Sequence, residues 1–274
     1  MTAGLDRLCF GTSTFVAGRL FPGKESGPGI AALRTALRAG VRLIHSNPNL
    51  GTQWAVRVVL DEIGPVSGIR HLVKAECPLQ GDLEARIHTA IEVSTGQLGT
   101  RRIDAIVLEI DLKRTRRTDL LHDRRALDTF FRTGARVAFA SGRVDGVYAY
   151  CHGPDALTAA LRQEAIGAVA GQYHLSSSWM RWHLTDIERA GKVFIGMSPL
   201  NRGALVDPLA PSPRARLRPL AWALDDPRIG AIAVTMSSPQ HVNEVIDTVR
   251  NAVRSRSRAP YTRRTRSKER APRD

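Results

Sequence analysis

Short apolar runs alternate with longer amphipathic segments along almost the whole chain, and this alternation constrains the fold most strongly. Eight apolar runs are present, at residues 8–15, 41–45, 71–75, 103–110, 136–141, 166–173, 192–198 and 229–236. Most are followed by apolar residues at three- and four-residue spacing, such as Val242, Val245, Ile246 and Val249, a pattern typical of helices. Continuous apolar strands separated by helices predict a parallel sheet that is buried on both faces.

Eight strand–helix units in about 250 residues describe an α/β fold of the (β/α)8 TIM barrel type. A doubly wound open sheet is the alternative, but no G-x-G-x-x-G sequence follows an early strand. We therefore expect one barrel domain over residues 1–253. Residues 254–274 have no apolar periodicity and predict a basic, disordered tail.

The net charge of +14 raises the question of nucleic-acid binding. The segment 254–274 alone holds nine Lys or Arg against two acids, so about half of the excess lies outside the predicted barrel. This tail is either a solubilising appendage or a docking segment for an acidic partner, and nucleic acid is not the partner we expect for the barrel.

The sequence argues against a membrane protein and against a metal site. No run approaches the roughly 20 apolar residues of a membrane-spanning helix, and the N-terminus lacks a signal-peptide pattern. The three cysteines, Cys9, Cys77 and Cys151, have unrelated spacings, and no H-x-x-x-H pair occurs. We expect a soluble cytoplasmic protein with reduced thiols, no membrane contact and no metal.

In a (β/α)8 barrel the chemistry lies at the C-terminal ends of the strands. His45, Lys74 and Glu109 occupy these positions on three consecutive predicted strands. An imidazole, an amine and a carboxylate at one barrel mouth form a general acid/base set. These three residues are therefore the predicted catalytic group.

The chain resembles the aldo-keto reductases from about Leu8 to Val249. The resemblance is carried by FGTSTF, by NPNLG at 47–51, by GQLGTRRIDAIVL at 96–108, by GQYHL at 171–175, by MSPLNRGAL at 197–205 and by VTMSSPQHVNEV at 234–245. It implies an aldo-keto reductase-like barrel and carbonyl reduction with NADPH.

Of the four catalytic residues that the resemblance implies, only the lysine is retained, as Lys74. The aspartate position holds His45, the tyrosine position holds Leu50 and the histidine position holds Glu109. Leucine cannot donate a proton, so the family's chemistry lacks its acid unless Tyr173, His45 or water replaces it.

The resemblance also assigns residues to a nicotinamide cofactor. The matching positions are Ser141, Gln172, Ser198, Leu200, Arg202 and Glu244. Met197 stands where an aromatic ring would stack, and His241 and Val245 replace an Arg and an Asn at the adenosine end. We therefore expect no cofactor, with NADPH in a weakened site as the alternative.

Three functions follow. The first is a repurposed enzyme that performs non-redox acid/base chemistry, namely elimination, isomerisation or cyclisation, on a small carbonyl compound from a biosynthetic pathway. There His45 is the acid or base, Glu109 the complementary group, and Lys74 stabilises an enolate or forms a Schiff base. The second is an NADPH-dependent aldo/keto or enone reductase with a substituted proton donor. The third is a non-catalytic barrel that acts as a binding or regulatory subunit.

A second basic run, at residues 113–125, follows the fourth strand on the face of the predicted site. It is interpreted either as a solvated loop or as a guide for a small anionic or carrier-bound substrate. The sequence does not predict the oligomeric state.

Overall fold

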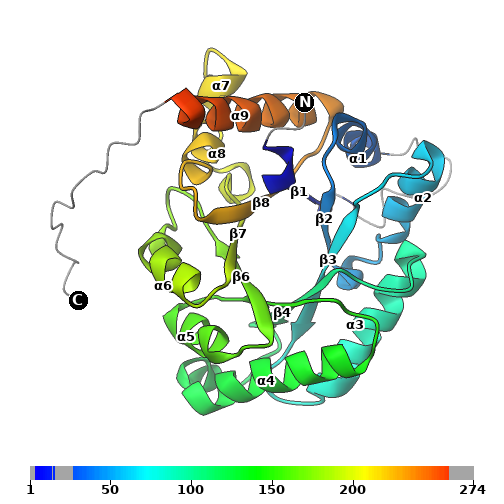
Figure 1. Ribbon diagram of the computed structural model, residues 1–274, viewed down its shortest axis with the longest axis vertical. Helices are drawn as coiled ribbons and strands as arrows, with labels where there is room; N and C mark the ends of the chain where they lie inside the picture. Colours follow the sequence, from blue (N-terminus) through cyan, green and yellow to red (C-terminus); the bar gives the residue numbers. More distant parts are fainter. Residues whose placement is uncertain (1–3, 14, 16–26, 259–274) are drawn as a thin grey trace, which may run out of the picture.

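The computed structural model describes residues 4–13, 15 and 27–258, and over these the chain forms a closed parallel barrel surrounded by helices (Figure 1). Each strand pairs with the next along the sequence, and the last strand pairs with the first. The strands are β1 (Leu8–Gly11), β2 (Leu43–Ser46), β3 (Arg70–Cys77), β4 (Ala105–Ile110), β5 (Val147–Tyr150), β6 (Ile166–Gln172), β7 (Val193–Met197) and β8 (Ile229–Thr235). The predicted (β/α)8 barrel is thus confirmed.

Helices separate most of the strands and cover the outside of the barrel. They are α1 (Pro28–Ala39), α2 (Trp54–Ile63), α3 (Leu83–Leu98), α4 (Arg124–Ala140), α5 (Pro154–Arg162), α6 (Leu184–Arg189), α7 (Pro213–Arg216), α8 (Arg218–Ala223) and α9 (Pro239–Arg258). Helix α1 begins with a proline at its first turn, and α4 begins where the Asp123 carboxylate accepts hydrogen bonds from the backbone N–H groups of Arg125 and Ala126.

Side chains alternate between two environments along each strand, as strand geometry requires. One set packs outward against the helices and includes Val73, Ala75 and Cys77 of β3. The other fills the barrel interior with small and medium apolar groups, including Leu72, Val107 and Ala170. Because the interior is packed, functional side chains are restricted to its open end.

One of the eight predicted strands is wrong. Residues 136–141 form the last turn of α4 and its C-cap, and the fifth strand is Val147–Tyr150. The buried residues of α4 recur at helical spacing, and Phe130, Phe131 and Val137 are among them. The helical spacing of apolar residues over the whole of α4 determines the structure here, and the short apolar run at 136–141 is the end of that helix.

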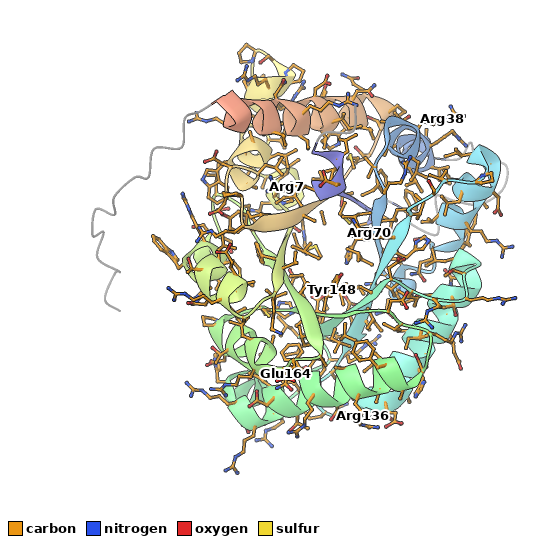
Figure 2. All side chains as sticks on the ribbon, viewed as in Figure 1. Arg7, Arg38, Arg70, Arg136, Tyr148 and Glu164 are labelled. Carbon is orange, nitrogen blue, oxygen red and sulfur yellow. The ribbon has the colours of Figure 1, made fainter. Side chains whose placement is uncertain are left out.

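The positive charge of the body is spread around the barrel. Figure 2 shows Arg38 on α1 and Arg136 on α4 at opposite sides of the molecule. Helix α9 continues to Arg258, so the domain boundary predicted at residue 254 falls inside this helix. The rest of the predicted tail, residues 259–274, lies outside the described residues.

Within the described part of the chain, no helix is both long and apolar enough to cross a membrane. All three cysteines are buried free thiols.

Candidate active site

A cavity of about 1030 Å³ opens at the C-terminal end of the barrel strands. Its floor is formed by inward-facing residues from the ends of several strands, among them His45, Lys74, Glu109, Tyr150 and Gln172. One side of its wall is the segment after β4, and the other is the loop after β7 with the start of α9. The volume is at the upper end of the range for small-molecule sites.

The strand register brings three polar side chains of the floor to one level. Glu76 of β3 is the register partner of Glu109 of β4, and Glu109 is the partner of Tyr150 of β5. Lys74 lies two residues before Glu76 on the same face of β3, because the side-chain period of a strand is two. The sequence had singled out Lys74 and Glu109 but not Glu76.

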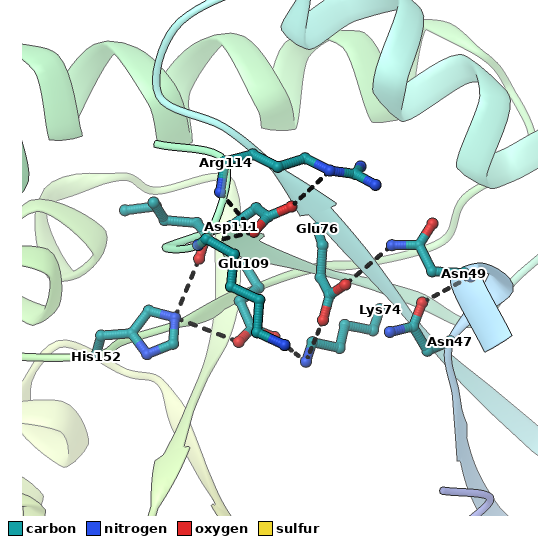
Figure 3. A network of polar contacts seen from close by, with 10 residues as sticks. Asn47, Asn49, Lys74, Glu76, Glu109, Asp111, Arg114 and His152 are labelled. Atoms are coloured by element: carbon teal, nitrogen blue, oxygen red, sulfur yellow. Dashed lines mark hydrogen bonds and ion pairs between the residues drawn. The ribbon is translucent and has the colours of Figure 1, made fainter. Parts of the chain in front are cut away.

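Lys74 is held between two carboxylates (Figure 3). Its Nζ lies 2.8 Å from Glu76 Oε1 and forms a second ion pair with Glu109 Oε2. Asn49 donates a hydrogen bond from Nδ2 to Glu76 Oε2 at 2.9 Å. Burial raises the pKa of Glu76, but the hydrogen bonds from Lys74 and Asn49 outweigh it and hold this pKa below its ordinary value.

Glu109 is 8% exposed and contacts a histidine that the sequence reasoning missed. His152 Nε2 lies 3.2 Å from Glu109 Oε1 and 3.2 Å from the carbonyl oxygen of Ile110. The carbonyl oxygen of Ile110 accepts a hydrogen bond, so Nε2 carries the proton and Nδ1 of the neutral ring is an acceptor. Burial lowers the pKa of His152, and the nearby Lys74 charge acts in the same direction.

His152 was missed because the fifth strand was placed ten residues too early along the chain. The signal was present in the sequence: VYAY at 147–150 is rich in aromatic and β-branched residues, and His152 follows it as a strand-end residue should.

His45 lines the cavity as predicted, and its Nε2 is buried without a hydrogen-bond partner among the described residues. Burial, with a smaller contribution from Lys74, lowers the pKa of His45 to about 4. The ring is therefore neutral at pH 7. A neutral imidazole at this position cannot pair with Lys74, whose ion pairs are formed with the two glutamates.

The tyrosine that lines the cavity is not the one that the sequence suggested. Tyr173, the predicted substitute donor, is buried between Phe194 and Trp222 and is not among the residues lining the cavity. Tyr150 lines the cavity, with Lys74 Nζ 5.7 Å from its ring centre. Burial raises the pKa of Tyr150 to about 12, which makes it a weak acid at neutral pH.

The residues assigned to a cofactor separate into three groups. Gln172, Ser198, Leu200 and Arg202 line the cavity. Glu244 lies on α9 one turn beyond the cavity-lining His241, and its carboxylate contacts Arg216 and Gln240. The placement of Ser141 at a strand end is wrong: it is the C-cap of α4, ahead of β5, and its hydroxyl donates to the carbonyl of Ala138. Ser141 therefore lies at the opposite end of the barrel from the cavity.

The loop after β7 has an unusual backbone. Ser198, Asn201 and Arg202 have φ values of 55°, 45° and 55°, and they are all of the non-glycine residues with positive φ in the described chain. Such conformations cost free energy and concentrate at binding sites. Left-handed residues also orient backbone N–H groups into concave anion-binding loops.

Several solved structures share this fold. An aldo-keto reductase from Klebsiella pneumoniae, solved with NADP and acetate, is 18% identical with a TM-score of 0.67, covering 89% of this chain and 85% of its own. The glycerol dehydrogenase of Gluconobacter oxydans is 16% identical with a TM-score of 0.63, covering 95% of both chains. An aldo-keto reductase from a deep-sea metagenome is 15% identical with a TM-score of 0.65, covering 90% and 89%. No protein-family model and no curated protein matches the sequence.

These similarities confirm the resemblance to aldo-keto reductases at the level of the fold. The chain has the aldo-keto reductase-like (β/α)8 barrel over nearly its whole described length. The activity has to be argued from the site itself, because one barrel fold supports many chemistries.

Proposed function

We propose that this protein is an oxidoreductase that uses NADP(H). The observation that carries the proposal is the extent of the cavity, which connects the Lys74 cluster with Gln172, the Ser198–Gly203 loop and the first turn of α9. An acid/base pocket for a small molecule alone does not require this extension. The neighbour from Klebsiella pneumoniae binds NADP on the same fold, which supports the choice of cofactor.

The residues at this end of the cavity fit a phosphate-bearing cofactor. Arg202 and Ser198 come from a loop with left-handed backbone, and Ser237 and His241 come from the start of the 20-residue helix α9. A guanidinium, hydroxyls and a helix N-terminus are the groups that bind phosphates in proteins. Gln172, on the neighbouring strand β6, would hold the amide of a nicotinamide. Met197 offers it a thioether in place of an aromatic face.

Bound NADP(H) would supply or accept a hydride at the cavity floor. The floor residues would orient the substrate there: Lys74 is fixed by Glu76 and Glu109, and His152 is fixed by Glu109 and the backbone of Ile110. Side chains whose terminal groups are fixed by two neighbours are preorganised, so they need little rearrangement when substrate binds.

Non-redox acid/base chemistry is the second candidate, and the contact between Glu109 and His152 favours it. The hydrogen bond to the Ile110 carbonyl fixes the Nε2–H tautomer and leaves His152 Nδ1 able to take a proton, and the Glu109 carboxylate beside the ring would stabilise the protonated form. In that mechanism the cavity would bind a small carbonyl compound, and proton transfer at the adjacent carbon would need no cofactor.

One pair of labelling experiments distinguishes the two functions. The protein is incubated with NADPH deuterated at the transferable position and a panel of aldehydes, ketones and imines, and products are examined by mass spectrometry. Deuterium on the reduced carbon supports the proposed oxidoreductase. Cofactor-independent exchange of solvent deuterium next to a carbonyl, with no label transferred from NADPH, would instead establish the non-redox function.

A further inference from the structure

The charges at the cavity floor do not balance. One ammonium group, on Lys74, contacts two carboxylates, on Glu76 and Glu109, so the cluster carries an excess of one formal negative charge. The other oxygen of Glu76 accepts a hydrogen bond from the neutral Asn49 Nδ2, and the other oxygen of Glu109 lies 3.2 Å from Nε2 of the neutral His152 ring. Neither of these groups supplies the missing positive charge.

The basic residues of the wall do not neutralise this floor. Arg202, on the loop after β7, has no ion pair with Glu76 or Glu109 and is assigned above to a cofactor phosphate. Lys113 and Arg114 line the cavity from the segment after β4, beyond the strand end. Arg114 Nε lies 3.5 Å from Asp111 Oδ2, so its charge is already faced by a carboxylate. Charges at a solvated rim are screened by water and contribute little at a partly buried cluster. An anionic group of the substrate, which is one of the two interpretations of the basic run at 113–125, therefore does not suit the floor.

A second observation points to a ligand that donates hydrogen bonds. His45 Nε2 is buried in the cavity wall and has no partner among the described residues. We assign the proton of the neutral ring to Nδ1, and in this tautomer Nε2 accepts a hydrogen bond. An N–H group bound at the floor would satisfy this acceptor while its positive charge faces the two glutamates.

Among the described residues, the floor also lacks a good proton donor. Tyr150 is a weak acid, because burial raises its pKa to about 12. The Nε2–H of His152 is donated to the carbonyl of Ile110, and Lys74 is paired with two carboxylates. Leu50, where the resembled family has a tyrosine, is 39% exposed and is not among the cavity-lining residues. A substrate that already carries its proton would make such a donor unnecessary.

We propose that the floor formed by Lys74, Glu76 and Glu109 binds a positively charged nitrogen of the substrate, and that the group reduced is a protonated C=N bond. This inference rests on the proposed oxidoreductase function. The hydride of NADPH forms the new C–H bond, the π electrons of the C=N bond become the nitrogen lone pair, and NADPH becomes NADP⁺. The amine product takes its next proton from water, so the reaction balances without a protein acid.

Binding measurements on a matched pair of ligands test the charge preference. Pyrrolidine is a cation at neutral pH, and cyclopentanol is a neutral ring of the same size. Calorimetric titration of the protein saturated with NADPH should show pyrrolidine binding about tenfold or more tightly than cyclopentanol. The reason is that the partly buried negative charge of the floor attracts a cation and gives a neutral ring no such attraction. Glu76→Gln should reduce this preference about tenfold while leaving the Lys74–Glu109 pair intact. Glu92→Gln, on the exposed face of α3, is the control for an equal change in net charge.

Turnover then tests the reaction. The cyclic imine pyrroline, at mildly acidic pH where it is protonated, should be reduced faster than cyclopentanone under the same conditions. Equal binding of the two ring ligands, a Glu76→Gln variant with unchanged preference, or faster reduction of the ketone would overturn the inference and leave the oxidoreductase proposal standing. Failure of NADPH to bind would overturn both.

Discussion

Lys74 Nζ and Glu76 Oε1 lie 2.8 Å apart although both residues belong to one strand. They share the inward face of β3, and the register places Glu109 of β4 directly beside Glu76. Three charged groups are therefore concentrated at the barrel mouth, where side chains no longer have to fill the packed interior. This cluster is the feature from which both the mechanism and the substrate preference are derived.

Replacing Lys74 by Met should destabilise the fold. Two neighbouring carboxylates would then face each other without a cation, and removing one partner of a largely buried ion pair costs about 3 kcal/mol. Urea denaturation of Lys74→Met measures the loss. The double variant Lys74→Met/Glu109→Gln removes the repulsion and should recover part of it. An unchanged midpoint in the single variant would mean that the cluster contributes nothing to stability.

The stability of the protein should fall in acid partly because of His45. Its pKa in the folded state is about 4, against the ordinary value of 6.5, so the unfolded chain binds the proton more readily. The stability that comes from burying His45 in its neutral form is fully present above about pH 6.5, and it is lost as the pH falls toward 4. Melting temperatures measured across this range should decline less steeply in His45→Gln. The exposed His88→Gln is the control, and equal slopes in both variants would contradict the assignment.

The corrected position of Ser141 has a direct consequence for the cofactor. Ser141→Ala should leave NADPH affinity unchanged, because the residue caps α4 at the opposite end of the barrel. Arg202→Ala should weaken NADPH binding about tenfold or more, since a charge-assisted contact to phosphate is lost. Fluorescence titration of both variants measures the difference. If Ser141→Ala weakened NADPH binding and Arg202→Ala did not, Ser141 would have to lie at the cofactor site, as the sequence predicted.

The helical assignment of residues 136–140 can be tested by two phenylalanines of α4. Phe131 is fully buried, whereas Phe139 is 42% exposed. Phe131→Ala should cost about 4 kcal/mol of unfolding free energy through lost burial and the cavity left behind. Phe139→Ala should cost much less, within about 1 kcal/mol. Comparable losses in chemical denaturation would indicate that residue 139 lies in a buried strand.

The fold could be predicted from the sequence because a parallel barrel repeats one pattern, a short apolar strand followed by an amphipathic helix. Seven of the eight strands were recognisable as short apolar runs, and an error in one, at 136–141, did not change the count. The boundaries in that region could not be predicted as well. VYAY at 147–150 has only four residues and half-buried tyrosines, so a neighbouring helix with a stronger apolar run concealed it.

The site was predicted to the extent that strand ends could be located. His45, Lys74 and Glu109 do line one cavity. Because the fifth strand was predicted at the wrong residues, His152 was missed and Ser141 was placed at the wrong end of the barrel. Glu76 was overlooked as a partner because ion pairing depends on side-chain reach and register, which the linear pattern does not reveal.

A fluorescence titration of the purified protein with NADPH, repeated with NADH, determines whether the cavity binds the cofactor. We expect saturable binding of NADPH in the micromolar range that is weakened in Arg202→Ala and in Gln172→Ala and retained in Ser141→Ala. Absence of binding at millimolar NADPH, with the protein shown to be folded, would contradict the oxidoreductase function and leave the acid/base chemistry of Glu109 and His152 as the explanation of the cavity.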